Sequence, residues 1–328
     1  MKQRLLGALP VSEIGLGCMG MSQSYGPFSD DESVDTIRRA IDLGTTFLDT
    51  SDMYGYGNGH NETLIGKAIA GRRDEVVLAT KFGIRGWTED RSFVLNSSPE
   101  YARQACEDSL RRLGVDVIDL YYLHRRDRSV PIEEIVGGMS ELVRAGKVRY
   151  IGLSEVNAET LRRAYATHPI TALESEYSLF ERYVEDSMLP TCRELGIGLV
   201  AFSPLGRGFL TGTVRDLSAL ADDDYRRTDP RFLGDNLAQN LRLLDRVTEI
   251  AAEIGATTAQ VALAWLLTRD EHVVPIPGTK RLRYLTENAA ASEISLSEKQ
   301  IHLLTTAMPA GSVAGERYPE GIMRTVDA

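Results

Sequence analysis

Short apolar or β-branched runs alternate with amphipathic segments along almost the whole chain, and this alternation limits the possible folds more than any other feature. Eight runs are typical of strands: residues 13–20, 45–51, 76–81, 117–124, 148–154, 170–175, 197–203 and 272–278. Helix-like segments lie between or after them, at 31–43, 61–70, 99–113, 132–145, 157–166, 186–195 and 281–291. Parallel strands need such crossover connections, so the pattern predicts an α/β fold with a parallel sheet.

The number of units separates two parallel architectures. Eight strands with intervening helices, at a spacing of roughly 30 residues, match a (β/α)8 TIM barrel. A doubly wound sheet, the alternative, would normally show fewer units or a break into two domains. We therefore predict a single barrel domain over residues 1–328, in which an irregular segment, 204–240, and a tail, 306–328, form loops at the C-terminal face.

Residues 15–20 spell a literal GxGxxG motif, which raises the alternative of a Rossmann dinucleotide site. That fingerprint requires its last glycine to open a helix, so that the pyrophosphate meets the helix N-terminus. Here Gly26 and Pro27 follow, and the first helix-like segment starts only at residue 31. The Rossmann interpretation is therefore disfavoured, although the glycines still allow a ligand to approach the backbone closely.

Charge and composition exclude several classes of function. The formal net charge of −10 and the isoelectric point of about 5.2 argue against general affinity for nucleic acid or anionic membranes. No apolar run approaches the roughly 20 residues that span a bilayer, and Gly7 and Pro10 break the N-terminal run, unlike a signal peptide. Three distant cysteines fit a reducing compartment, so we expect a cytoplasmic protein, and a homo-oligomer is compatible with the sequence. The five histidines show no HxxxH or HxH spacing, so we predict no metal site.

Ionisable side chains stand at the ends of the predicted strands, where the loops of a barrel build its site. Asp49 ends the second strand and Tyr54 follows in a glycine-rich loop. Lys81 ends the third strand, and His124 ends the fourth. Each alone has an ordinary explanation, such as a loop cap, a solvated charge or a packed ring. Four such groups at adjacent strand ends are better explained by a shared catalytic use.

The chemistry of these four groups is complementary. A tyrosine has an ordinary pKa near 10, too high for easy proton transfer at neutral pH. A nearby ammonium is expected to lower it, a carboxylate holds the ammonium in place, and a histidine can donate to the same substrate oxygen. Such a device protonates a carbonyl oxygen while hydride reaches the carbonyl carbon.

At these residues the sequence resembles the aldo-keto reductase superfamily, over about residues 4 to 310. The resemblance rests on FLDTSDMYGYGNGHNETLIGKAI, VVLATKFG, LYYLH, GKVRYIGLS, AFSPLGRGFLTG and PIPGTK, in this order. The PLGRGFLTG stretch is most similar to the branch that holds perakine reductase and the plant auxin-induced-type reductases. The resemblance implies a (β/α)8 barrel, a catalytic tetrad of Asp49, Tyr54, Lys81 and His124, NADPH or NADP+ as cofactor, and reduction of small aldehydes or ketones to alcohols.

The resemblance also implies the residues of the two binding sites. The cofactor-binding positions are Gly17, Cys18, Met19, Asp49, Ser154, Glu155, Glu174, Phe202, Ser203, Pro204, Leu205, Gly206, Gly208, Gly278, Thr279, Lys280, Arg283, Glu287 and Asn288. The substrate pocket is expected from Met19, Tyr25, Tyr54, Trp87 and His124, with the 204–240 segment and the tail near Tyr318. Trp87 has packing against the barrel rim as its alternative.

The segment around Lys280 also carries a physical argument. Lys280, Arg281 and Arg283 crowd the first turn of the last predicted helix, where cations oppose the helix dipole unless an anion offsets them. A 2′-phosphate is such an anion, and lysine and arginine suit it. This placement favours NADPH over NADH, and a merely solvated basic turn is the alternative.

Glu174 departs from the resemblance, because most relatives have glutamine there. An ionised glutamate can only accept hydrogen bonds, and its charge would favour the cationic, oxidised nicotinamide ring over the neutral, reduced one. Glu155 likewise stands where asparagine is frequent.

Two other functions stay open from the sequence. A Schiff-base aldolase could use Lys81 as its nucleophile, although the basic turn would then have no role. A cofactor-sensing regulatory subunit with slow turnover could keep the same residues.

Overall fold

The computed structural model describes residues 1–89 and 92–327. Eight parallel strands form one sheet in the order β3, β4, β5, β8, β9, β10, β11, β12. Their bounds are Leu16–Gly17, Phe47–Asp49, Val77–Phe82, Ile118–Leu123, Val148–Ser154, Ala172–Glu176, Gly198–Phe202 and Val273–Pro275. A parallel bridge between Gly17 and Gly278 joins the first strand to the last, with the Gly17 amide 3.3 Å from the Pro277 carbonyl oxygen. The sheet therefore closes on itself, and the predicted (β/α)8 barrel is confirmed.

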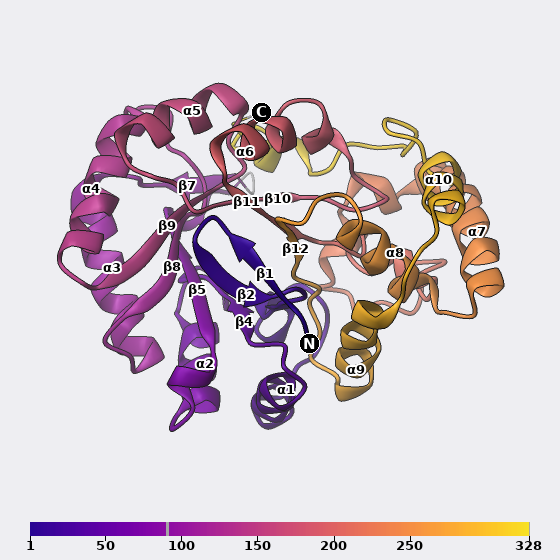
Figure 1. The fold of residues 1–328 in the computed structure, drawn as a ribbon, viewed down its shortest axis with the longest axis horizontal. Coiled ribbons are helices and arrows are strands. Elements are labelled where there is room, and N and C mark those ends of the chain that lie inside the picture. The colour runs from indigo at the N-terminus through magenta and orange to yellow at the C-terminus, as the bar shows by residue number, and fades with distance from the viewer. Residues whose placement is uncertain (90–91, 328) are drawn as a thin grey trace.

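Helices follow the strands and cover the outside of the barrel (Figure 1). They are α1 (Asp30–Asp42), α2 (His60–Ile69), α3 (Pro99–Leu113), α4 (Ile132–Arg144), α5 (Ala158–Thr167), α6 (Met188–Leu195), α7 (Gly234–Ile254), α8 (Thr258–Leu267), α9 (Leu282–Ala290), α10 (Glu298–Ala307) and α11 (Glu320–Met323). Side-chain caps set several starts: Ser98 accepts from the Tyr101 amide, and Thr257 and Gln260 form a capping box. The predicted helical segments are confirmed to within a few residues.

An N-terminal hairpin, β1 (Gln3–Leu6) and β2 (Leu9–Ser12), was not predicted. Leu6, Leu9 and Val11 belong to the same apolar cluster as the inward-facing residues of the barrel strands, such as Phe47 and Val200. The hairpin lies over the front of the barrel in Figure 1. It therefore closes the end opposite the strand carboxyl ends, which leaves those ends as the open side.

The long segment after β11 is more ordered than the sequence suggested. Three short 3-10 turns, Phe209–Thr211, Tyr225–Arg227 and Pro230–Phe232, precede α7, which already begins at Gly234. The prediction of an irregular loop over 204–240 is therefore wrong for its last seven residues, where the helix has started. The predicted tail, 306–328, begins in the last turn of α10 and carries α11, and residue 328 lies outside the described residues.

A second hairpin, β6 (Ile84–Trp87) and β7 (Phe93–Leu95), follows β5 and stands beside the barrel mouth. Among residues 1–89 and 92–327, no single helix has the length and apolar character to cross a membrane, and α7 and α8 meet that test only as a pair bent by 87°.

Candidate active site

The four ionisable groups predicted at the strand ends meet in the structure. Asp49 is the last residue of β4, Lys81 stands near the end of β5, and His124 directly follows β8. Tyr54 lies in the turn after β4, and its ring packs edge-on against the His124 ring, with 5.8 Å between centroids. Parallel strands put their carboxyl ends on one side, so four positions far apart in the sequence converge there.

Lys81 is the centre of this cluster and is fully buried. Its ammonium donates to Asp49 Oδ1 at 2.5 Å, to the Thr50 carbonyl oxygen at 2.9 Å and to the Tyr54 hydroxyl at 3.4 Å. A fourth oxygen, Oε1 of Glu174 on β10, lies 3.3 Å from the same nitrogen. Since β10 is three strands away from β5 in the sheet, the lysine reaches Glu174 across the barrel interior.

The surroundings set the protonation of Lys81 and Tyr54. Burial alone would lower the pKa of Lys81, but Asp49, Glu174 and Tyr54 together hold that pKa above its ordinary value. Burial raises the pKa of the Tyr54 phenol, and the attraction of the Lys81 ammonium opposes this only in part. The expectation that Lys81 lowers the tyrosine pKa below its ordinary value is therefore wrong, because burial is the larger effect. The phenol keeps its proton at neutral pH.

His124 is neutral in this environment. Burial lowers its pKa well below the ordinary value, and the positive charges of Arg125 and Lys81 lower it further. Its Nδ1 lies 3.1 Å from the Ser51 hydroxyl oxygen. When that hydroxyl donates to Nδ1, the proton resides on Nε2, which can then donate to a ligand. Ser51 was not predicted, since a serine beside a strand end carries no distinctive signal.

The sequence allows an ionised Glu174, whereas the surroundings in the structure favour the protonated acid. Burial raises its pKa to about 8, and the negative charge of Asp49 adds to this, while Lys81 opposes it. A raised pKa favours the protonated acid near neutral pH, and in that form the carboxyl group can donate as well as accept. Its Oε2 and the Oδ2 of Asp49 are both buried without a hydrogen-bond partner among the described residues.

Glu155 is held by the C-terminal tail. Its carboxylate receives two hydrogen bonds from Arg317, at 2.8 and 3.3 Å, and one each from the Tyr183 hydroxyl and the Glu176 amide. Its backbone φ is +53°, in the left-handed region. The Glu155 side chain is thus bound to Arg317 of the tail. The contact of Glu155 with a cofactor stays a prediction.

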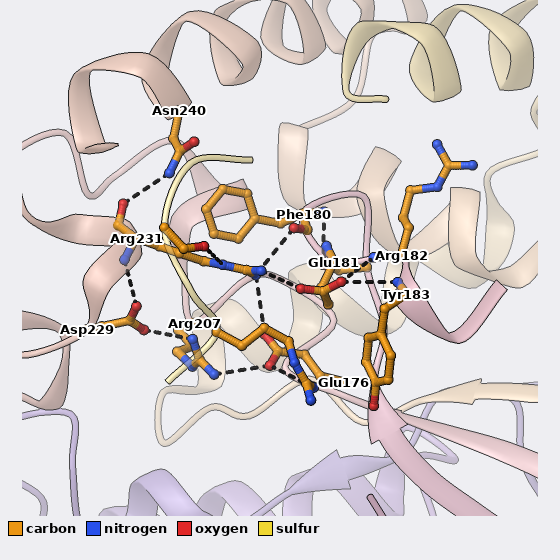
Figure 2. A network of polar contacts seen from close by, with 12 residues as sticks. Glu176, Phe180, Glu181, Arg182, Tyr183, Arg207, Asp229, Arg231 and Asn240 are labelled. Atoms are coloured by element: carbon orange, nitrogen blue, oxygen red, sulfur yellow. Dashed lines mark hydrogen bonds and ion pairs between the residues drawn. The ribbon is translucent and has the colours of Figure 1, made fainter. Parts of the chain in front are cut away.

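A buried ionic network joins the segment after β11 to the segment after β10 (Figure 2). Arg207 bridges Glu176 at 3.1 Å and Asp229 at 2.7 Å, and all three side chains are buried. Arg231 pairs with Glu181 and donates to the Phe180 carbonyl oxygen, while Asn240 donates to the Arg231 carbonyl oxygen. These pairs fix the long segment beside the mouth, and no sequence motif indicated them.

The basic segment at α9 already has protein partners. Lys280 donates to the carbonyl oxygens of Tyr25 and Gly26, at 2.8 and 3.1 Å. Arg281 pairs with Glu32 on α1, whereas Arg283 lies 5.8 Å from the Tyr284 ring centroid. Protein oxygens thus offset part of the positive charge, which weakens the argument that an anion must do so.

The other predicted site residues lie along the same rim. Gly17 ends β3, and Cys18 and Met19 follow it. Ser154 ends β9 and Phe202 ends β11. The turns after β11 contain Ser203, Pro204, Leu205, Gly206 and Gly208. Gly278 and Thr279 follow β12, and Glu287 and Asn288 lie on α9. Tyr25 is half-buried, and the guanidinium of Arg226 lies 5.3 Å from its ring centroid. Trp87 packs on Phe93 in the β6–β7 hairpin, with 4.4 Å between ring centroids, and is 41% exposed. Rim packing therefore accounts for Trp87, and a substrate contact stays a prediction.

With this geometry in place, the comparisons with known proteins decide the family. Residues 13–308 match the profile of the aldo/keto reductase family. The chain belongs to the aldo/keto reductase family. This reductase is 46% identical over 316 residues to a probable aldo-keto reductase from Glycine max, covering 95% of this chain and 90% of the relative. It is 44% identical over 323 residues to an NADP(+) aldo-keto reductase from Schizosaccharomyces pombe, covering 97% and 94%.

Solved structures agree with the family. A glycerol dehydrogenase from Gluconobacter oxydans superposes on the reductase with a TM-score of 0.83 at 27% identity, covering 99% of this chain and 96% of the other. An aldo/keto reductase from Klebsiella pneumoniae, solved in complex with NADP and acetate, gives 0.73 at 28% identity, with coverage of 97% and 99%. The branch within the family stays a prediction.

Proposed function

We propose that this reductase uses NADPH to reduce the carbonyl group of an aldehyde or ketone, with Tyr54 as the proton donor. The proposal rests above all on the buried Lys81 ammonium, which lies 2.5 Å from Asp49 Oδ1 and 3.4 Å from the Tyr54 hydroxyl oxygen. A carbonyl oxygen placed against that hydroxyl would also be near the edge of the His124 ring, which packs on Tyr54.

Each residue has a distinct part in the proposed reaction. NADPH supplies the hydride when it is bound. Tyr54 gives its phenolic proton to the carbonyl oxygen as negative charge develops there, and the Lys81 ammonium stabilises the phenolate that forms. Asp49 holds Lys81 in place, and neutral His124 donates from Nε2 to the same oxygen. Asp49 and Lys81 are buried, whereas Tyr54 and His124 are half-buried at the mouth. Water therefore screens the ion pair little, while the two rings stay open to a substrate.

Several groups present at the mouth fit the cofactor. The unpartnered Asp49 Oδ2 and Glu174 Oε2 leave acceptor or donor capacity beside Lys81, where a nicotinamide would lie. Lys280 and Arg283 suit a 2′-phosphate, for which Lys280 would exchange its carbonyl partners. The NADP(+) relative from Schizosaccharomyces pombe supports the same choice of cofactor.

The aldolase alternative loses support at Lys81. A Schiff base requires an unprotonated amine, whereas the two nearby carboxyl groups hold the pKa of Lys81 above its ordinary value. The cofactor-sensing alternative shares the binding residues and differs only in turnover, so the assay below distinguishes it.

The test follows NADPH absorbance with a panel of aldehydes for the wild type, Tyr54→Phe and Tyr56→Phe. Tyr56 lies in the same loop but is 63% exposed, so it is a matched control. We expect Tyr54→Phe to lower kcat by about 10²–10⁴-fold while NADPH still binds, and Tyr56→Phe to leave kcat within a factor of two or three. Equal activity of the two variants would contradict the role of Tyr54, and binding without turnover in the wild type would favour a sensor.

A further inference from the structure

The cluster around Lys81 holds one more carboxyl group than the proposed reaction needs. The Lys81 ammonium lies 2.5 Å from Asp49 Oδ1 and 3.3 Å from Glu174 Oε1. Both carboxyl groups are buried, at 1% and 3% exposure, and each leaves its second oxygen without a hydrogen-bond partner among the described residues. One ammonium thus faces two acids inside the barrel.

Within residues 1–89 and 92–327, no other titratable group forms an ion pair with these two carboxyl groups as a second positive charge. Burial raises the pKa values of the Cys18 thiol, directly after β3, and of the Tyr122 phenol, on β8, so both are neutral, as is Tyr54. Neutral His124 also adjoins the cluster. Arg125, which follows β8, is the second cation nearby, and its guanidinium donates to Ser154 Oγ and the His124 carbonyl oxygen.

The distances decide which carboxyl group keeps the negative charge. If both were ionised, the buried cluster of Lys81, Asp49 and Glu174 would carry a net charge of about −1, which burial opposes. Asp49 is the closer partner of the ammonium, so it is the better stabilised anion. Burial raises the pKa of Glu174 to about 8, consistent with a proton on this group.

The following step rests on the proposed function. Hydride and proton reach the two atoms of one carbonyl group, so the nicotinamide must lie within a few ångströms of the Tyr54 hydroxyl. That hydroxyl is 3.4 Å from Lys81 Nζ, which places the ring beside the Glu174 carboxyl group as well. The oxidised ring is a cation and the reduced ring is neutral, so only the oxidised form attracts a carboxylate.

We propose that Glu174 is a specificity-determining residue for the cofactor's redox state: it stays a neutral carboxylic acid in the free enzyme and with NADPH, and it ionises when NADP+ binds. The carboxylic acid then becomes a carboxylate and its proton passes to solvent, with no change in oxidation state. NADP+ binding is therefore coupled to proton release, and NADPH binding is not.

The first test is calorimetry of NADP+ and NADPH binding at pH 7 in buffers of different ionisation enthalpy, which counts protons. We expect wild type to release a substantial fraction of one proton with NADP+ beyond that seen with NADPH, and Glu174→Gln to abolish this difference. Asp52→Asn is the matched control, because Asp52 is another buried carboxyl group with a raised pKa that lies outside the lysine cluster. It should retain the difference.

The second test is the pH dependence of the affinity ratio. Below about pH 8, the affinity for NADP+ relative to NADPH should rise with pH by up to tenfold per unit, and it should level off above that value. The 2′-phosphate titrates in both cofactor forms and cancels in the ratio. Glu174→Gln should give a flat ratio, and a slope unchanged from wild type would overturn the proposal.

A third measurement needs no cofactor and separates this inference from the proposed function. Infrared difference spectra of the free enzyme, wild type minus Glu174→Gln, should show the carbonyl stretch of a protonated carboxyl group at pH 7. Its absence would refute the neutral Glu174 even if aldehyde reduction is established. Failure to bind either cofactor would instead refute the proposed function, and with it the coupling.

Discussion

The ion pair between Arg317 and Glu155 offers the sharpest test of how the tail is held. Its two hydrogen bonds are 2.8 and 3.3 Å long, and the two side chains are 7% and 0% exposed. Arg317→Met would leave a buried carboxylate without its cation, although the Tyr183 hydroxyl would still donate to it. Removing one partner of a buried pair costs about 3–5 kcal/mol.

That cost can be converted into an unfolding temperature. An unfolding entropy of about 2.1 cal/mol/K per residue gives roughly 0.7 kcal/mol/K for 328 residues, so the expected fall in Tm is roughly 4–7 °C. Arg162→Met is the matched control, since Arg162 forms an equally bidentate pair with Glu194 on the surface. Exposed pairs contribute about 0–1 kcal/mol, so the control should lose no more than about 1–2 °C.

The double variant Arg317→Met/Glu155→Gln and a pH series complete the test. The double variant should recover part of the loss, because no buried charge remains. Burial opposes ionisation of Glu155, but the charges of Arg317 and Arg125 and the hydrogen bonds from Arg317 and the Glu176 amide together outweigh it and lower the pKa of Glu155 in the folded state. The stability from this pair is therefore present above the unfolded pKa of about 4.3 and is lost as pH falls. Equal losses for Arg317→Met and Arg162→Met at pH 7 would refute the reasoning.

Three further predictions follow from the site and the barrel. Burial lowers the pKa of His124 in the folded state, so below about pH 6.5 the unfolded state binds a proton more readily and the free energy of unfolding should fall. Urea unfolding measured from pH 5 to 8 should show this fall, and His124→Phe should reduce it. Lys81→Met should lower kcat by at least about 10²-fold, and an unchanged kcat would argue against its role beside Tyr54. Gly152→Ala should lower the free energy of unfolding by about 1–3 kcal/mol or prevent folding, because the added carbon would lie 2.5 Å from the Tyr122 ring. Gly137→Ala is the control and should not lower it, because the added carbon would meet no atom within 4 Å.

The sequence predicted the barrel because each unit repeats one local pattern, and it predicted the four groups around Tyr54 because parallel strands end on one side. It did not predict α8, whose residues are buried on nearly every side, so that no amphipathic stripe marks the helix. The hairpin at the N-terminus was missed because its two strands have only four residues each. Short strands carry little periodicity.

Contacts between distant segments set the remaining features. Glu155 and Arg317 are 162 residues apart, and no pattern in the adjacent sequence of either residue predicts that they pair. The protonation of Tyr54 and Glu174 also depends on how much water the finished barrel excludes, which only the packed structure determines. Residue types at strand ends can be read from sequence, whereas their pKa values cannot.

The bridge between Gly17 and Gly278 has a consequence for how the chain reaches this structure during synthesis. The two residues lie about 260 positions apart, so the pairing that closes the barrel can form only after residue 278 has left the ribosome. Until β12 emerges, the other seven strands can form only an open sheet, with β3 and β11 as unpaired edges. The pairing of Gly17 with Gly278 should therefore form last. A nascent chain stalled before residue 273 should remain an open sheet that chaperones recognise.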